Sequence, residues 1–149
     1  MRGIYDIAVY SKSRQLVLLA EVKWVKESSE ASATFFRKNL IANHLLPCEP
    51  HFLLAYRNEF FLWDAGSSAD DPPRFRAPAK SVVKKYLSTV SSAEVAPGPE
   101  SMESAVKLWL SELVSGIELP DASSEPDKML VDSGLYEKIK NGEVTRKLH

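Results

Sequence analysis

The chain has little cysteine and no long hydrophobic run. One of its 149 residues is cysteine, Cys48, so an intramolecular disulfide is excluded, and this usage fits a reducing compartment. No stretch approaches the roughly 18 consecutive apolar residues that a membrane-spanning helix needs. The first residues, MRGIYDIAVYSKSR, contain no apolar segment of signal-peptide length. These absences predict a cytoplasmic protein with no membrane partner.

The chain also has no large excess of positive or negative charge. The 19 Lys and Arg residues nearly balance the 20 Asp and Glu residues, which leaves a net charge of -1. Binding to nucleic acid would therefore need a local basic patch, because no overall positive charge is available. The sequence also has no Gly-rich phosphate loop and no Ser-His-Asp triad signature. These patterns disfavour nucleotide-dependent enzymes and triad hydrolases.

The composition that is present, 44% hydrophobic and 26% charged, is typical of a globular protein of one-domain size. The most apolar run, Leu16–Ala20, predicts a central strand buried on both faces. The β-rich run Gly3–Tyr10 precedes it across the polar break Ser11–Arg14. The two runs together predict a β-hairpin.

Two charged residues follow this apolar run. In a strand, Glu21 and Lys23 project from the same face, and burying them costs several kcal/mol per ion unless they are paired or functional. In a hairpin, the residue numbers of directly opposed residues add to a constant sum. Asp6 lies on the same face as Glu21 and Lys23 only if that sum is odd. A sum of 27 pairs Tyr10 with Val17 and places Asp6 opposite Glu21. The alternative is a solvated sheet end with an ordinary salt bridge.

The following segments complete an α/β pattern. We expect a helix that Ser28 or Ser29 caps and that Pro47 ends, with Phe36 and His44 on one stripe. Two further strands, His51–Tyr56 and Phe60–Trp63, are joined by a turn of hairpin length. The order strand, strand, helix, strand, strand over residues 1–64 predicts a mixed sheet.

The second half, residues 65–149, has a different composition. Residues 65–79 are rich in Gly, Ser, Asp and Pro and predict an exposed connection. Helical patterns follow, of which Ser101–Ser115 is the longest, ending at Gly116. We therefore expect a linker and a helical extension that packs on the core or on a partner chain.

Asp6, the triplet Glu21-Val22-Lys23 and the strand pair that ends at Trp63 resemble the core of the PD-(D/E)xK, or restriction-endonuclease-like, nuclease superfamily, in a bacterial branch. The resemblance to the nuclease core covers about the first 64 residues. It implies a restriction-endonuclease-like mixed sheet and hydrolysis of nucleic-acid phosphodiesters with Mg²⁺ or Mn²⁺ as cofactor. DNA is favoured as the substrate, and RNA stays open as the alternative.

The resemblance also implies residue roles. Asp6, Glu21 and the backbone carbonyl of Val22 would be metal ligands, and Lys23 would orient the attacking water or offset charge on the phosphate. The chemistry is consistent, because Mg²⁺ prefers carboxylate and carbonyl oxygens and lowers the pKa of a bound water. A lysine on the same face would pair with the carboxylates at rest and meet the phosphate during reaction.

The sequence departs from the family pattern at three places. Tyr5 stands where the family has a proline before the first acid. The family often supplies another acid from a helix before the first strand, and many members place a Gln on the helix after the Lys strand. Three alternatives stay open: Glu27 or Glu30 replaces the acid, a homo-oligomer completes the site through its C-terminal helices, or the fold is a catalytically inactive module for protein or nucleic-acid binding.

Basic residues outside the triplet are weaker candidates for nucleic-acid binding, and an ordinary charged surface is the alternative explanation. These candidates are Lys12, Arg14, Arg37, Lys38 and Arg57. A zinc site at His44, Cys48 and His51 is less favoured, since a structural site takes four ligands and no fourth is nearby.

Overall fold

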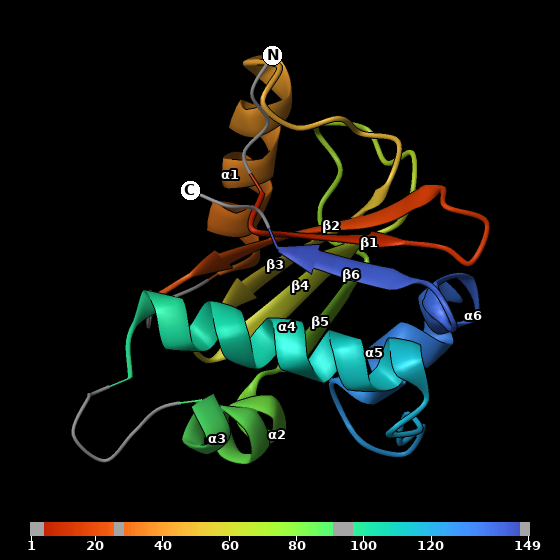
Figure 1. The fold of residues 1–149 in the computed structure, drawn as a ribbon. Helices are drawn as coiled ribbons and strands as arrows, with labels where there is room; N and C mark the ends of the chain where they lie inside the picture. The colour runs from red at the N-terminus through yellow and green to blue at the C-terminus, as the bar shows by residue number, and fades with distance from the viewer. Residues whose placement is uncertain (1–4, 26–28, 91–96, 147–149) are drawn as a thin grey trace.

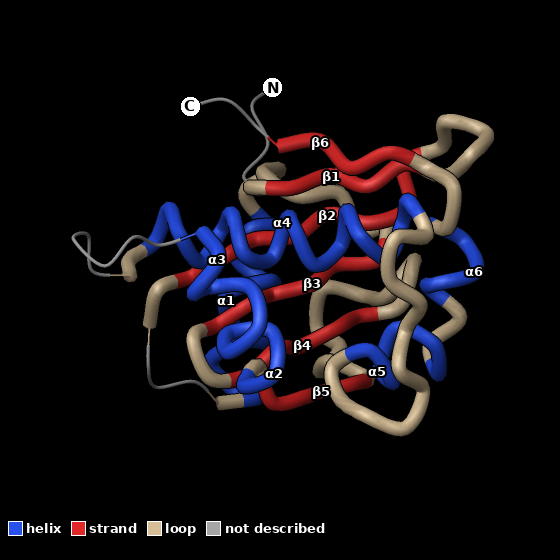
Figure 2. Tube along the Cα trace, turned by 60° about the horizontal axis from the view of Figure 1, so that its bottom comes forward, coloured by secondary structure: helices blue, strands red, loops and turns tan. Residues whose placement is uncertain are grey.

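A computed structural model describes residues 5–25, 29–90 and 97–146. Six strands form one mixed sheet in the order β5-β4-β3-β2-β1-β6 (Figure 2). The strands are β1 (Ile7–Tyr10), β2 (Leu16–Lys23), β3 (His51–Tyr56), β4 (Glu59–Trp63), β5 (Phe75–Pro78) and β6 (Glu143–Arg146). Neighbouring strands are antiparallel except β2 and β3, which are parallel.

Helices cover both faces of this sheet. They are α1 (Glu30–Ala42), α2 (Lys80–Val82), the π-helical turn η1 (Val83–Leu87), α3 (Ser88–Val90), α4 (Pro99–Ser115), α5 (Asp127–Asp132) and α6 (Leu135–Ile139). Figure 1 shows α4 crossing the front of the sheet and α1 behind it. None of the helices in the described part combines the length and the apolar character needed to cross a membrane.

Strand β2 is the interior strand that the sequence predicts, and it packs against both layers. Leu18 and Ala20 belong to the apolar cluster under α4, whereas Leu19 belongs to the cluster under α1. This alternation follows the two-residue period of a strand. The prediction of an α/β fold with a mixed sheet is confirmed.

Over most of its length the β1–β2 hairpin has the register that would place Asp6 opposite Glu21. Ile7 pairs with Ala20 and Val9 pairs with Leu18, so the numbers of paired residues add to 27. The predicted pair of Tyr10 with Val17 is wrong, because the register shifts after Val9 and Tyr10 pairs with Leu16. Such an irregularity leaves one residue of the longer strand without a partner.

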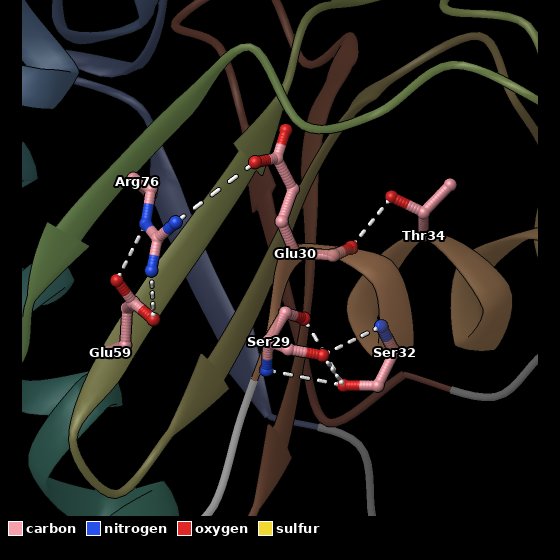
Figure 3. Close-up of polar contacts among 6 residues, drawn as sticks. All are labelled: Ser29, Glu30, Ser32, Thr34, Glu59 and Arg76. Atoms are coloured by element: carbon pink, nitrogen blue, oxygen red, sulfur yellow. Dashed lines mark hydrogen bonds and ion pairs between the residues drawn. The ribbon is translucent and has the colours of Figure 1, made fainter.

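Helix α1 begins where the sequence predicts and ends earlier. The Ser29 Oγ accepts a hydrogen bond from the Ser32 N–H at 3.0 Å, and the Ser32 Oγ accepts one from the Ser29 N–H at 3.2 Å (Figure 3). Ser28 lies outside the described residues. Asn43 closes the helix, and His44 has a positive φ of 58°. His44 is therefore outside α1, and its predicted place on the helical stripe is wrong.

The second half contributes strands as well as helices. Strand β5 pairs with β4 at one edge of the sheet, and β6 pairs with β1 at the other. Arg146 on β6 also donates from Nε to Glu103 of α4 at 2.7 Å. The expected helices, including α4 with Gly116 at its end, are present. The expectation that this half is entirely linker and helix is wrong at β5 and β6.

Candidate functional site

Asp6 lies immediately before β1, beside the end of β2. Its backbone N–H donates to the Ala20 carbonyl at 2.8 Å, and its Oδ2 accepts a hydrogen bond from the Val22 N–H at 2.7 Å. Glu21 lies between Ala20 and Val22, the two residues that Asp6 contacts. The Asp6 side chain therefore replaces a strand partner for Val22, and its carboxyl group lies beside that of Glu21.

Glu21 is half-buried, and its environment raises its pKa to about 8. Burial is the largest cause, followed by a hydrogen bond with the Asp6 side chain and by the negative charge of Asp6, while the charge of Lys23 acts in the opposite direction. Two adjacent carboxyl groups resist ionising together, so one proton is held between them at neutral pH.

The atoms at this site fit a hard cation. The Glu21 Oε2 is buried and has no hydrogen-bond partner in the described part of the chain, and carboxylate oxygens are preferred ligands of Mg²⁺. The Val22 N–H points towards Asp6, and in a strand the carbonyl of the same residue projects to the same edge. Among residues 5–25, 29–90 and 97–146, no three His, Cys, Asp or Glu side chains form a metal-binding group.

Lys23 lies on the face of the sheet that α1 covers. Its Nζ is 3.9 Å from the centroid of the Phe36 ring of α1. Ion pairs between described residues do not include Lys23, although its charge lowers the pKa of Glu21. The structure thus brings Asp6, Glu21 and Lys23 together, with the ammonium group resting on an aromatic ring. The sequence pattern gave no indication of the contact with Phe36.

Glu30, a candidate for the additional acid, belongs to a different cluster. It lies in the first turn of α1, and its Oε2 is 4.0 Å from an Arg76 amino group on β5. Arg76 also donates to both carboxylate oxygens of Glu59, at 2.7 and 3.0 Å (Figure 3). The Glu30 carboxylate therefore pairs with Arg76 at the exposed edge of the sheet. Glu27 lies outside the described residues.

The predicted basic residues are spread over the molecule. Lys12 and Arg14 are exposed in the turn between β1 and β2, at the other end of the hairpin from Asp6. Lys38 is exposed and forms an ion pair with Asp70 at 2.8 Å. Arg57 follows β3 and lies at the same end of the sheet as Lys23, because β2 and β3 are parallel.

Arg37 is buried, and the prediction of an exposed Arg37 is wrong. Its side chain is 1% exposed, and its two amino groups donate to the carbonyls of Ser68 at 2.7 Å and Ser67 at 2.9 Å. The buried positions of α1 are Ala33, Arg37 and Leu40. Their spacing of four and three residues is the helical period, and this period could have placed Arg37 on the inner face.

Comparisons of the chain with protein-family models, with curated proteins and with solved structures return no significant match. The resemblance to the restriction-endonuclease-like superfamily therefore stays a prediction.

Proposed function

We propose that this chain is a restriction-endonuclease-like nuclease that uses Mg²⁺ or Mn²⁺ to hydrolyse phosphodiesters of DNA. The observation that supports the proposal is the contact between Asp6 and the Val22 N–H, which sets the Asp6 carboxyl beside that of Glu21. Asp6 is buried and Glu21 is half-buried, and such an acid pair is costly unless it has a function. Binding of a divalent cation would displace the proton and offset both charges.

The Asp6 carboxyl, the Glu21 carboxyl and the Val22 carbonyl would hold the cation. When bound, the cation supplies a water of lowered pKa and stabilises charge on the phosphoryl oxygens. Asp6 fixes the site geometry, because its contacts with Ala20 and Val22 tie it to both sides of Glu21. The protein therefore provides a pre-organised acid pair on a rigid interior strand.

Lys23 would provide positive charge next to the phosphate. Its ammonium group rests on the Phe36 ring, a contact worth about 0.5–2 kcal/mol, so a side-chain rotation is enough to release it. A hydrogen bond from Lys23 to a phosphate oxygen would stabilise the charge that develops as water attacks phosphorus and the bond to the leaving oxygen breaks.

The test is cleavage of labelled single-stranded, duplex and branched DNA with Mg²⁺ or Mn²⁺, using wild type, Glu21→Ala and Lys23→Ala. We expect cleavage by the wild type, and loss of cleavage in both variants with an unchanged circular dichroism spectrum. Lys128→Ala is a matched control, since Lys128 is exposed on α5, and it should cut like the wild type. Unchanged cutting by Glu21→Ala or Lys23→Ala contradicts the proposal.

A second candidate is a catalytically inactive module on the same fold that binds protein or nucleic acid. The contact of Lys23 with Phe36 favours it, because this lysine then has a packing role without any substrate. It predicts no metal affinity at Asp6 and Glu21, so a metal ion bound there would contradict it. Assembly through the C-terminal helices also stays a proposal, and sedimentation as a monomer at every workable concentration would contradict it.

A further inference from the structure

A cavity of about 230 Å³ lies at the carboxyl ends of the parallel strands β2 and β3. The described residues that line it are Trp24, Arg57, Val83, Leu87 and Pro97. Trp24 directly follows β2 and Arg57 directly follows β3. The crevice outside the carboxyl ends of parallel strands is where open α/β sheets bind ligands. The position of the cavity is therefore that of a ligand site.

Two side chains give this cavity a flat, cationic wall. The Arg57 guanidinium carbon is 4.1 Å from the centroid of the Trp24 ring. The ion pairs between described residues do not include Arg57, and its guanidinium lies over the face of the Trp24 ring. Val83 and Leu87 add apolar surface. Aromatic faces, guanidinium planes and apolar walls are the surfaces on which unpaired nucleobases stack.

The cavity is also close in sequence to the acid pair of Asp6 and Glu21, through Trp24. Trp24 is three residues after Glu21, which corresponds to about 10 Å of extended strand. The Val25 N–H donates to the Lys23 carbonyl at 2.9 Å, so the chain turns at this point. Lys23 lies on the α1 side of the sheet, whereas Trp24 packs against the cluster under α4. A nucleic-acid strand that crosses the end of β2 would contact both Lys23 and Trp24.

We propose that the cavity holds an unpaired nucleobase of the DNA strand whose phosphate lies at Asp6 and Glu21. This inference rests on the proposed function and adds a substrate form to it. Stacking on the Trp24–Arg57 pair requires an exposed base face, which paired bases inside a duplex do not offer. The preferred substrate would thus be single-stranded, or would carry an unpaired base next to the cut.

The experiment measures fluorescence anisotropy of a labelled oligothymidylate, and of the same strand with abasic sites, in a Glu21→Gln background that prevents cutting under the proposed function. We expect Trp24→Leu and Arg57→Gln each to weaken binding of the intact strand by about tenfold, with little effect on the abasic strand. Arg57 is exposed, so its replacement leaves the fold intact. Arg74→Gln, at an exposed arginine just before the edge strand β5, is the matched control and should bind like the parent.

Equal binding of the intact and abasic strands, unchanged affinity in Trp24→Leu and Arg57→Gln, or no binding of either strand would overturn the inference. A Mn²⁺ titration of the wild type separates this failure from failure of the proposed function. Metal binding with no effect of Trp24→Leu would reject the nucleobase cavity alone. Base-dependent binding without a metal site would reject the nuclease and leave the cavity in place.

Discussion

Asp6 and Val22 are joined by a hydrogen bond of 2.7 Å from the Val22 N–H to the Asp6 Oδ2. This contact occurs where the β1–β2 ladder ends, so a carboxylate satisfies a backbone donor that would otherwise lack a strand partner. It also fixes the position of Asp6 next to Glu21, and the resulting proximity of two acids has measurable consequences.

The free energy of unfolding should fall as the pH rises from about 5 to about 8. Folding raises the pKa of Glu21 from 4.5 to about 8, so in this window the folded state keeps a proton that the unfolded state has lost. The stabilisation that this proton provides is complete below the unfolded pKa and is lost as the pH passes the folded pKa. After allowance for partial exposure, we expect a loss of about 1–3 kcal/mol, measured by urea unfolding in a chelating buffer.

The Glu21→Gln variant should remove this pH dependence and be more stable than the wild type at pH 8. Asp6→Asn should reduce the slope, because it removes the neighbouring charge. Glu49→Gln is the control, since Glu49 is exposed and its replacement should leave the slope unchanged. A wild-type stability that is flat across this window would show that the two carboxyl groups do not share a proton.

Arg37 and Lys38 are sequence neighbours with opposite environments, so their replacements should differ. Arg37→Met removes the donors for the Ser67 and Ser68 carbonyls, and we expect the free energy of unfolding to fall by about 2–4 kcal/mol. Lys38→Met removes only an exposed ion pair and should change stability little. Thermal unfolding of both variants measures the contrast, and equal effects would contradict the structural role of Arg37.

The hairpin and the acid pair could be predicted from the sequence because they depend on local patterns. The apolar run Leu16–Ala20 identifies the interior strand, and strand periodicity places Glu21 and Lys23 on one face. The register could not be selected, because strand pairing depends on contacts that single residues do not encode. An odd sum is required only if Asp6 joins the face of Glu21. The bulge near Tyr10 gives no sequence signal for the same reason.

The edge strands could not be predicted from such patterns. β5 contains Pro78 and follows two further prolines, which favour a loop by composition but are tolerated at a sheet edge. β6 has the polar sequence EVTR, and it forms a strand because β1 offers free backbone groups and Glu103 pairs with Arg146. Both strands are therefore determined by tertiary contacts.

The most direct test of the proposed metal site is a calorimetric titration of Mn²⁺ at pH 7 in two buffers with different heats of ionisation. Because the pKa of Glu21 is about 8, metal binding should release close to one proton per ion, and the observed heat should differ between the buffers. Asp6→Asn and Glu21→Gln should abolish binding, whereas Glu49→Gln should bind like the wild type. No saturable binding by the wild type, or binding that survives both site substitutions, would contradict a metal site at Asp6 and Glu21.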